Sequence, residues 1–256
     1  MSDLPHILYT VISFALTAVL LFVNVRKVKD PTKKNEILKA SALLTVVIHY
    51  SSLYTDFFRD GSATVENSML LPLYPCNIAM WLLLIVAFMK DKESKVFQIL
   101  SEITFYLGLV GGILGIVLNE NYIATPNLAD WGILKGLLSH STMLYGCIYL
   151  LAGGYIKIGV RNMISVLIGL CGLVLDGALM IALFKAFGLE PVNCMYLLEP
   201  PFPAMPWLNV LTIGLLALAL VFAVTAIYEQ IALKKEDRWY YQLSEKIKEK
   251  QSKAGK

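Results

Sequence analysis

Hydrophobic residues form seven runs along the chain, and each run is about as long as a membrane-crossing helix. A helix needs about 20 predominantly apolar residues to cross the hydrocarbon core of a bilayer. The pattern therefore predicts an all-α fold, a seven-transmembrane helical bundle. The predicted spans are Ile7–Val25, Ile37–Phe57, Leu70–Met89, Val96–Leu118, Ile133–Tyr155, Met163–Phe184 and Trp207–Ala232.

The composition supports a membrane protein and excludes several other classes. Of the 256 residues, 57% are hydrophobic and only 16% are charged, whereas charged residues make up about 25% of a typical soluble domain. No basic patch interleaved with aromatic residues occurs outside the tail, so we expect no nucleic-acid partner. The four cysteines form no CxxC pair, so the chain predicts neither a disulfide framework nor a metal site.

The distribution of Lys and Arg predicts the orientation of the bundle. All but three of the 22 basic residues fall in alternate connections and in the tail, and the three on the other side are Arg59, Lys135 and Lys185. Because basic residues are retained on the cytoplasmic side, we expect the N-terminus outside and the C-terminus cytoplasmic. This arrangement requires an odd number of spans and agrees with seven. The predicted parts are a membrane domain, residues 1–233, and a cytoplasmic basic tail, residues 234–256.

Two segments outside the spans carry further signals. The loop Lys185–Pro206 holds five of the ten prolines together with aromatic residues, so we expect a folded lid over the outer mouth, with a plain connector as the alternative. In the tail, Trp239, Tyr240 and Tyr241 precede a mixed-charge stretch. We interpret the tail as an interfacial anchor that then frays in water, in preference to a partner-binding helix.

Two of the predicted spans carry glycines at spacings that favour close helix packing. Small residues let membrane helices approach one another closely. We therefore interpret these glycines as packing positions and not as part of a reactive site. They are Gly108, Gly111, Gly112 and Gly115 in the fourth span and Gly169, Gly172 and Gly177 in the sixth.

Polar side chains from four different spans fall at about the same depth below the outer boundary. From a helix rise of about 1.5 Å per residue, Cys76 lies roughly 9 Å deep, His140 roughly 10 Å, and His49 and Asp176 each roughly 12 Å. Glu102 lies instead near the cytoplasmic end of its span. Polar groups in hydrocarbon are costly and indicate function by default. The alternative is structural, a hydrogen bond from each histidine or from Asp176 to a neighbouring helix.

Two prolines, Pro72 and Pro75, stand just before Cys76 and Asn77 at the head of the third span. Proline removes a backbone donor, and a broken helix within hydrocarbon is tolerated only where protein or a wet cavity satisfies the freed groups. We therefore expect the stretch from Leu70 to Asn77 to line a cavity. A thiol in that place is either a small apolar filler or a nucleophile.

The chemistry of a reactive thiol defines a candidate catalytic set of Cys76, His140 and Asp176. A nearby histidine can take the thiol proton and return it to the leaving group, and a carboxylate can hold the imidazole tautomer. Asn77 and the backbone N–H groups of a helix start can donate to a developing oxyanion. The candidate substrate-binding residues are His49, Tyr50, Asn77, Trp81, Ser139, Tyr145, Asn193 and Tyr196.

Three short segments together resemble a known family. They are Leu71–Ala79, with the sequence LPLYPCNIA, the triplet Ser139–Ser141, and Val192–Pro201 before the last span. These segments, within about residues 40–230, resemble the YwaF-like and transmembrane protein 164 family of integral membrane proteins. An animal member of that family is an ether-phospholipid acyltransferase. The resemblance implies that Cys76 carries an acyl group and that His140 acts as the base.

We therefore expect a membrane-embedded acyltransferase or transacylase that acts on phospholipids or lysophospholipids through a thioester at Cys76. Its partner would be a membrane lipid, its location a bacterial plasma membrane, and it would need no metal or organic cofactor. One alternative is a non-enzymatic seven-span transporter or receptor-like binder of a small or lipidic ligand, and another is a structural subunit. No nucleotide-binding motif occurs, which argues against a primary pump. The oligomeric state stays open.

Overall fold

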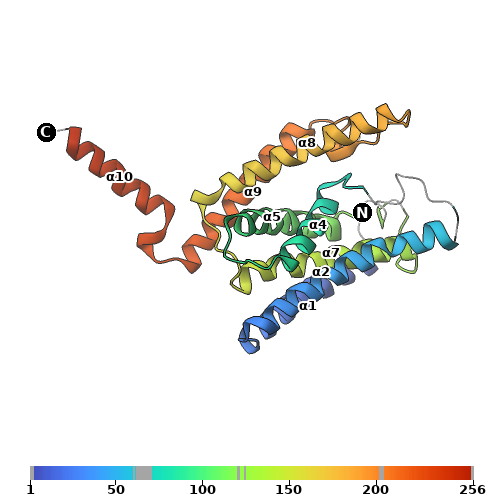
Figure 1. The fold of residues 1–256 in the computed structure, drawn as a ribbon, viewed down its shortest axis with the longest axis horizontal. Helices are drawn as coiled ribbons and strands as arrows, with labels where there is room; N and C mark the ends of the chain where they lie inside the picture. Colours follow the sequence, from blue (N-terminus) through green and yellow to red (C-terminus); the bar gives the residue numbers. More distant parts are fainter. Residues whose placement is uncertain are drawn as a thin grey trace.

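The computed structural model describes residues 3–59, 61, 71–119, 122–123, 125–201 and 205–254, and within these ranges the chain is helical with no strand. These residues form eight α-helices, and Figure 1 shows how they are arranged. They are α1 (Leu4–Lys27), α2 (Pro31–Leu53), α4 (Pro75–Phe88), α5 (Lys95–Val117), α7 (Trp131–Ala152), α8 (Ile164–Ala186), α9 (Val210–Ala232) and α10 (Trp239–Ala254). A π-helical stretch, η1 (Tyr54–Arg59), extends α2, and the short 3-10 turns are η2 (Val160–Asn162), η3 (Cys194–Tyr196) and η4 (Lys235–Asp237).

Each predicted span overlaps one helix of the described residues, but the third begins later than predicted. Leu70, its predicted first residue, lies outside the described residues. Tyr74 has an extended backbone with φ −131° and ψ 155°, and α4 begins at Pro75. A proline disfavours helix in the preceding residue and favours its own place in a first helical turn. The two prolines thus set the start of α4 and leave a helix of 14 residues.

Most of the long helices begin at a side chain that caps their first N–H groups. Such a cap satisfies donors that have no partner within the helix and stabilises it by about 1 kcal/mol. The sequence places Asp, Ser or Asn at these points and so defines where the helices start. The caps of α1, α2, α5, α7 and α9 are Asp3, Asp30, Ser94, Asp130 and Asn209.

Helix α7 lies between α2 and α5 and runs antiparallel to both, as the pairing of residues along them shows. Polar contacts join α2 to α7 over most of their length. From one end to the other they are Trp131 Nε1 to Ser51 Oγ at 2.9 Å, Thr45 Oγ1 to Thr142 Oγ1 at 3.0 Å, and Lys34 Nζ to the Gly153 carbonyl at 3.2 Å. We call the end where α4 begins the Asn77 end, and the end where α4 finishes the Lys92 end.

A glycine face on α5 accounts for its close approach to α7. A Cβ atom added at Gly112 would lie 2.9 Å from Leu144 Cβ, and one at Gly115 would overlap the ring of His140. A Cβ at Gly108 would likewise overlap the Cys147 sulfur. The glycines predicted to pack helices do so here, and α5 and α7 could not sit this close with larger residues.

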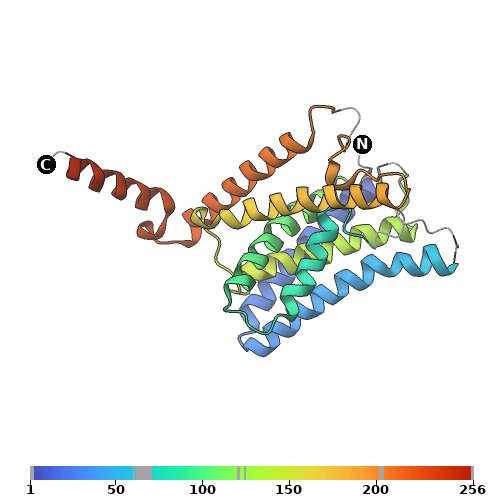
Figure 2. The same ribbon diagram turned by 45° about the horizontal axis from the view of Figure 1, so that its top comes forward.

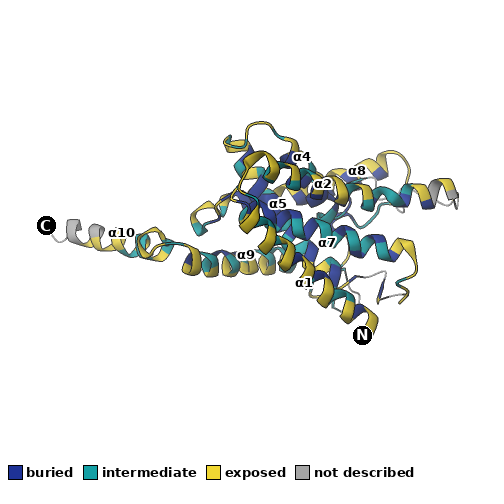
Figure 3. Ribbon diagram, turned by 90° about the horizontal axis from the view of Figure 1, so that it is seen from below, coloured by how far each residue is buried: buried dark blue, intermediate teal, exposed yellow. Residues whose placement is uncertain are grey.

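Helices α2, α4, α5 and α7 enclose the main hydrophobic core. Its fully buried side chains include Leu38, Met80, Leu83, Phe97 and Tyr149. Figure 3 shows the buried residues gathered along α5 and α7, while α1 and α9 are exposed along much of their length. The well-packed part of the molecule is therefore the four-helix group, and we call it the tight half.

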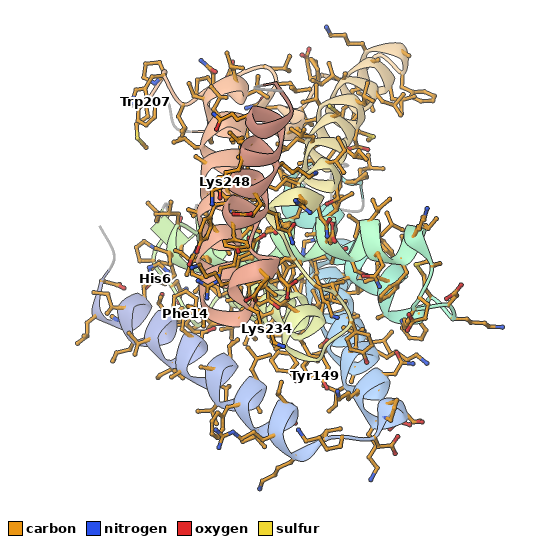
Figure 4. All side chains as sticks on the ribbon, turned by 90° about the vertical axis from the view of Figure 1, so that its left-hand side faces the viewer. His6, Phe14, Tyr149, Trp207, Lys234 and Lys248 are labelled. Carbon is orange, nitrogen blue, oxygen red and sulfur yellow. The ribbon has the colours of Figure 1, made fainter. Side chains whose placement is uncertain are left out.

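Helices α8 and α9, which we call the loose half, join the tight half through fewer contacts. The buried residues of α9 are Val221, Thr225 and Glu229, all in its second half. Thr225 Oγ1 lies 2.6 Å from the hydroxyl of Tyr106 on α5. Figure 2 shows α9 diverging from α8, and Trp207 and Lys234 mark the two ends of α9 in Figure 4.

The glycines of α8 follow the packing prediction only in part. Gly169 packs against Ile103 of α5, and Gly177 packs against Met195 and Leu197 of the loop that holds η3. A Cβ at Gly172 would meet nothing within 4 Å. Close packing at Gly172 was therefore a wrong prediction, because the α8 face that carries it is not covered. Glu102, as predicted, lies toward the Lys92 end, where it accepts a hydrogen bond from Ser165.

Among the residues that the structure describes, four helices are long and apolar enough to cross a membrane: α1, α5, α8 together with η2, and α9. Helix α4 is apolar but shorter, with 14 residues. Helices α2 and α7 are long enough but carry polar side chains along the faces that they turn to each other. The fold is thus that of an all-helical integral membrane protein.

The tail after α9 differs from the prediction of a frayed segment. Residues Trp239–Ala254 form α10, which projects away from the bundle in Figure 1. The Glu229 carboxylate accepts the backbone N–H of Trp239 at 2.8 Å and that of Val160 at 2.7 Å. One buried side chain of α9 therefore holds the start of α10 and the turn before α8.

Candidate functional site

The candidate site begins at the first turn of α4. Cys76 is the second residue of this helix and is half-buried. The buried Asn77 follows, and its Oδ1 accepts the backbone N–H of Tyr74 at 3.1 Å. The positive end of a helix dipole stabilises negative charge near the first turn. Cys76 therefore lies at the positive end of the α4 dipole.

Asn77 also determines how His49 is held. Because its Oδ1 faces an N–H donor, its Nδ2 faces His49 Nε2, at 3.0 Å. An amide nitrogen only donates, so in this hydrogen-bond network Nε2 accepts and the His49 proton is assigned to Nδ1. Asn77 thus caps α4 and orients His49 on α2. Only the second N–H of Asn77 Nδ2 is left for the predicted oxyanion role.

Lys135 is a functional candidate that the sequence analysis missed. The prediction placed it among the basic residues of the outer side, but the structure buries it in the second turn of α7. Its Nζ donates to the backbone carbonyl of His49 at 3.4 Å. Ser139, one turn later, is also fully buried, and its hydroxyl donates to the Gly136 carbonyl at 2.9 Å. The spacing of four residues between Lys135 and Ser139 was the available signal, since it places both on one helix face.

Cys76 and His140 lie against neighbouring positions of the same α5 face. Cys76 Cβ is 3.8 Å from the position that a Cβ on Gly111 would take. The His140 ring covers Gly115, four residues further along α5. Positions four apart on a helix are separated by about 6 Å along its axis. The predicted nucleophile and the predicted base therefore lie about one helical turn apart along α5, near the junction of α4, α5 and α7.

A backbone carbonyl orients His140. Its Nδ1 lies 2.7 Å from the Gly136 carbonyl oxygen, which can only accept, so Nδ1 carries the proton in this arrangement. The lone pair of a neutral imidazole is then on Nε2, which packs against Gly115. The prediction that Asp176 holds the tautomer was wrong, because Gly136, one turn back on α7, occupies that role.

Asp176 lies at the same end of the molecule but in a different group. Burial first, and then the neighbouring Asp176 carboxylate, raise the pKa of the Cys194 thiol in η3. The adjacent Gly177 packs against Met195 and Leu197. The Oδ2 atom of Asp176 is buried and has no hydrogen-bond partner among the residues that the structure describes. Asp176 therefore faces the η3 loop of the loose half.

The loop between α8 and α9 covers the start of α4, as the lid prediction required. Met195 N–H donates to the Leu73 carbonyl at 2.9 Å, and the rings of Tyr196 and Tyr74 lie 5.7 Å apart. Met195 and Tyr196 both have left-handed backbones, with φ 51° and 57°, a conformation that is uncommon for non-glycine residues. Both contacts place this loop over the start of α4.

Several predicted substrate-binding residues make contacts within the protein. The Asn193 amide is used within its loop, accepting from Leu198 and Glu199 N–H at 3.0 and 3.1 Å. Tyr50 packs against His49, but its other neighbour, Trp81, is 37% exposed on the outer face of α4. The spacing of these residues from the core positions could be predicted, but not the direction in which their side chains point.

Tyr145 also lies away from the predicted cavity. Its hydroxyl accepts from Asn24 Nδ2 at 2.8 Å, and its ring stacks on Tyr149. An apolar groove of about 300 Å³ runs instead between α1, α5 and α7. It includes Leu144, one turn after His140. The groove is lined by Phe14, Thr17, Ala18, Leu21, Ile113, Leu144 and Ile148.

The start of α1 closes one side of the site region, which the sequence analysis did not predict. The buried His6 donates from Nε2 to the Ile116 carbonyl at 2.7 Å and stacks on Tyr122. Ser13 donates to the hydroxyl of Ser141, next to His140, at 2.7 Å. Because His6 precedes the predicted span, the depth argument could not select it. No three His, Cys, Asp or Glu side chains converge to form a metal site in the described part of the chain.

Comparison with known proteins adds a family to this geometry. The comparisons with curated proteins and with solved structures gave no significant match. A family model, described as the TMEM164 family, matches residues 1–228, which include α1 to α8 and most of α9. This match confirms the resemblance to transmembrane protein 164, whereas the YwaF-like label is not tested by it. The chain belongs to the TMEM164 family of membrane proteins.

Proposed function

We propose that this protein is a seven-span membrane acyltransferase or transacylase that acts on phospholipids or lysophospholipids through a thioester at Cys76. The observation that carries the proposal is the placement of Cys76 and His140 on adjacent positions of the α5 glycine face. The nucleophile is at a helix start, and the base has its Nδ1 bound to Gly136. Family membership supports the choice of a lipid reaction.

The first half of the reaction forms the acyl-enzyme. His140 Nε2 takes the proton of the Cys76 thiol, and the sulfur attacks the ester carbonyl of the donor lipid. The sulfur–carbon bond forms, the ester carbon–oxygen bond breaks, and the same proton passes to the departing lysophospholipid oxygen. N–H groups in the first turn of α4 face the negative oxygen that develops on the carbonyl.

The second half transfers the acyl group to an acceptor. The hydroxyl of an acceptor lysophospholipid gives its proton to His140 Nε2 and attacks the thioester carbon. The new ester bond forms, the sulfur–carbon bond breaks, and the proton returns to the Cys76 sulfur. No electrons are gained or lost, so the cycle needs no cofactor.

Lys135 and the apolar groove would hold the substrate in this proposal. The Lys135 ammonium, beside His49 at the Asn77 end, supplies positive charge on the α2 side of Cys76 and suits a lipid phosphate. The groove between α1, α5 and α7 is lined by apolar side chains and reaches the turn after His140, so it suits an acyl chain. The η3 loop would act as a lid over the α4 start.

The proposed topology places the Asn77 end outside and the Lys92 end in the cytoplasm of a bacterium. The pairings of α2, α5 and α7 gather the basic connections at the Lys92 end and leave Arg59, Lys185 and the buried Lys135 toward the other. The positive-inside rule supports this orientation. Labelling of a cysteine probe at position 252 in intact cells tests it, and labelling from outside would contradict it.

The thioester is tested by intact-mass analysis of the purified chain after incubation with phospholipid and acid quenching. Wild type should gain one acyl mass that hydroxylamine removes, and Cys76→Ala should gain none. The matched control is Cys171→Ala, which removes an exposed thiol on α8 and should keep the adduct. Cys76→Ser should retain at most a trace, because a hydroxyl is a weaker nucleophile.

The same variants distinguish an enzyme from a lipid-binding protein. If Cys76→Ala remodels phospholipids at the wild-type rate, the enzyme proposal is wrong. If neither wild type nor Cys76→Ala shows turnover but both bind lipid, the chain is a binder. Thermal unfolding of Cys76→Ala should match wild type closely, since Ala fits the same small space.

A further inference from the structure

A cavity of about 430 Å³ lies at the Lys92 end, on the opposite side of the molecule from Cys76. Along α7, 14 residues separate His140 from Gly154 at the cavity, or roughly 21 Å of helix. The cavity is formed by the first turn of α2, the connection from α4 to α5 and the end of α7. Its lining residues are Pro31, Thr32, Asn35, Lys92, Glu93, Gly154 and Tyr155.

Two lysines concentrate positive charge beside this cavity. The Lys92 ammonium donates to the carbonyls of Val86 and Ala87 at 2.6 and 3.0 Å and lies 5.0 Å from the centre of the Phe97 ring. Burial, and then the charge of Lys39, lower the pKa of Lys92 to about 8. Within the described ranges neither lysine forms an ion pair, and the acidic residue that lines the cavity, Glu93, is exposed.

Polar atoms without partners lie in the same region. Asn35 Oδ1 and the Tyr155 hydroxyl belong to lining residues, and both are buried without a hydrogen-bond partner in the part of the chain that the structure describes. The hydroxyl of Tyr149, whose ring lies 6.3 Å from that of Tyr155, is also unpaired there. An unsatisfied buried polar group costs about 1–3 kcal/mol. The two tyrosine hydroxyls can donate, and beside two ammonium groups they match a ligand with several acceptor oxygens.

We propose that this cavity binds a phosphate group, carried either by an anionic phospholipid or by a small soluble phosphate compound. The α4 C-terminus accounts for part of the positive charge, because a helix end is equivalent to about half a negative charge. Two ammonium groups exceed that charge, and the cavity provides space for an anion beside them. The site lies at helix ends, where the phosphates of a surrounding bilayer would also lie, and it is separate from the proposed acyl-transfer site.

Binding to the full chain in detergent micelles tests the proposal, with short-chain phosphatidylglycerol and inorganic phosphate as separate probes. Asn35→Asp adds a negative charge with almost no change of shape, and it should weaken phosphatidylglycerol binding about tenfold or more. Its matched control is Gln251→Glu, which adds the same charge on the exposed surface of α10 and should leave the affinity unchanged.

A second pair of variants keeps the test independent of the folding of Asn35→Asp. Lys39→Gln removes a charge beside the cavity, whereas Lys33→Gln removes one from the exposed side of the same helix. Only Lys39→Gln should weaken binding. Equal affinities within both pairs, or no binding of either probe, would overturn the proposal.

The probes also identify the source of the phosphate group. If both bind and both are weakened by Asn35→Asp, a soluble phosphate suffices. If phosphatidylglycerol alone binds at the site, the occupant is a lipid head group. Both outcomes support a phosphate site.

The pH dependence gives a further check. The phosphodiester of phosphatidylglycerol keeps its charge between pH 7 and 9, while Lys92, with a pKa of about 8, loses its proton in that range. Binding of the anion favours the protonated lysine, so affinity should fall as pH rises above about 8 and recover at lower pH. Glu93 and Tyr155 also line the cavity, and Lys39 lies close enough for its charge to lower the pKa of Lys92. A pH profile that is unchanged in Lys92→Gln would assign the titration to one of these three groups.

Discussion

The tight half and the loose half differ in how each is attached to the rest of the molecule. In the tight half, glycines of α5 admit side chains of α7 directly, and α2 pairs with α7 through polar groups along its length. In the loose half, α9 is fastened mainly at Thr225 and Glu229. Close packing therefore surrounds Cys76 and His140, while the loop between α8 and α9 lies over the start of α4.

This difference suits a proposed enzyme that must hold reacting groups still and also admit a lipid. Groups that react need fixed geometry, which dense packing supplies. Elements that open are drawn from regions with few buried contacts. The η3 loop, with two left-handed residues, connects the two regions. The comparison leads to four predictions, from the largest effect to the smallest.

The largest effect should come from His140. His140→Ala should reduce the rate of acyl-enzyme formation about 10²–10⁴-fold, the usual size of lost general-base assistance. Single-turnover mass measurements give this rate. His6→Ala, which changes a histidine of α1 that bonds to Ile116, is the control for loss of an imidazole near the site. If His140→Ala forms the acyl-enzyme at the wild-type rate, His140 is not the general base.

The same Gly→Ala substitution should change the stability of the protein in opposite directions in the two halves. Gly115→Ala forces a methyl group against the His140 ring and should destabilise the protein by about 1–3 kcal/mol. Gly214→Ala in α9 meets nothing within 4 Å and should stabilise it by up to about 1 kcal/mol, because Ala favours a helix. Unfolding in detergent measures both, and equal shifts would show that the halves are packed alike.

The attachment of α9 can be weakened at one hydrogen bond. Tyr106→Phe removes the hydroxyl that lies 2.6 Å from Thr225 and should cost about 1 kcal/mol. Hydrogen exchange should then speed up in α9 and stay unchanged in α7. The control, Tyr228→Phe, removes an α9 hydroxyl for which the described residues provide no hydrogen bond. Equal acceleration in α7 would mean that the halves open together.

The smallest effect should come from Asp176, although it is the one carboxylate of the candidate catalytic set. Asp176→Asn should leave acyl-enzyme formation within about threefold of wild type, because Gly136 and not Asp176 orients His140. The same single-turnover assay as for His140→Ala applies. A loss of a hundredfold or more would return Asp176 to the catalytic set and place the η3 loop in the mechanism.

Much of the fold and part of the site could be predicted from periodicity, proline placement and depth. Apolar runs determine helices because each must satisfy its backbone internally in hydrocarbon. Depth alone correctly placed Cys76, His140 and His49 at one end of the bundle. Depth gives position along a helix axis but not rotation about it. For that reason Asp176, at the right depth, was assigned to the wrong neighbours.

Other features depended on tertiary contacts that a single sequence does not contain. The charge of Lys135 is typical of a loop residue, whereas its spacing from Ser139 is typical of a residue on a buried helix face. Only the contact with α2 shows that Lys135 is buried. Trp81 and Tyr145 were aromatic residues near the predicted cavity, yet their rings point to other parts of the molecule. The carbonyl that orients His140 is invisible to any search for side-chain partners.

The polar pairing of α2 with α7 has a consequence for biogenesis. In the proposed topology each of these helices carries buried polar groups, which are costly when a helix enters the bilayer alone. During synthesis α2 emerges about a hundred residues before α7, so its polar face has no partner in that interval. During membrane insertion α2 must therefore be kept out of contact with lipid until α7 has been synthesised. Chains truncated before residue 131 should be degraded by quality-control proteases.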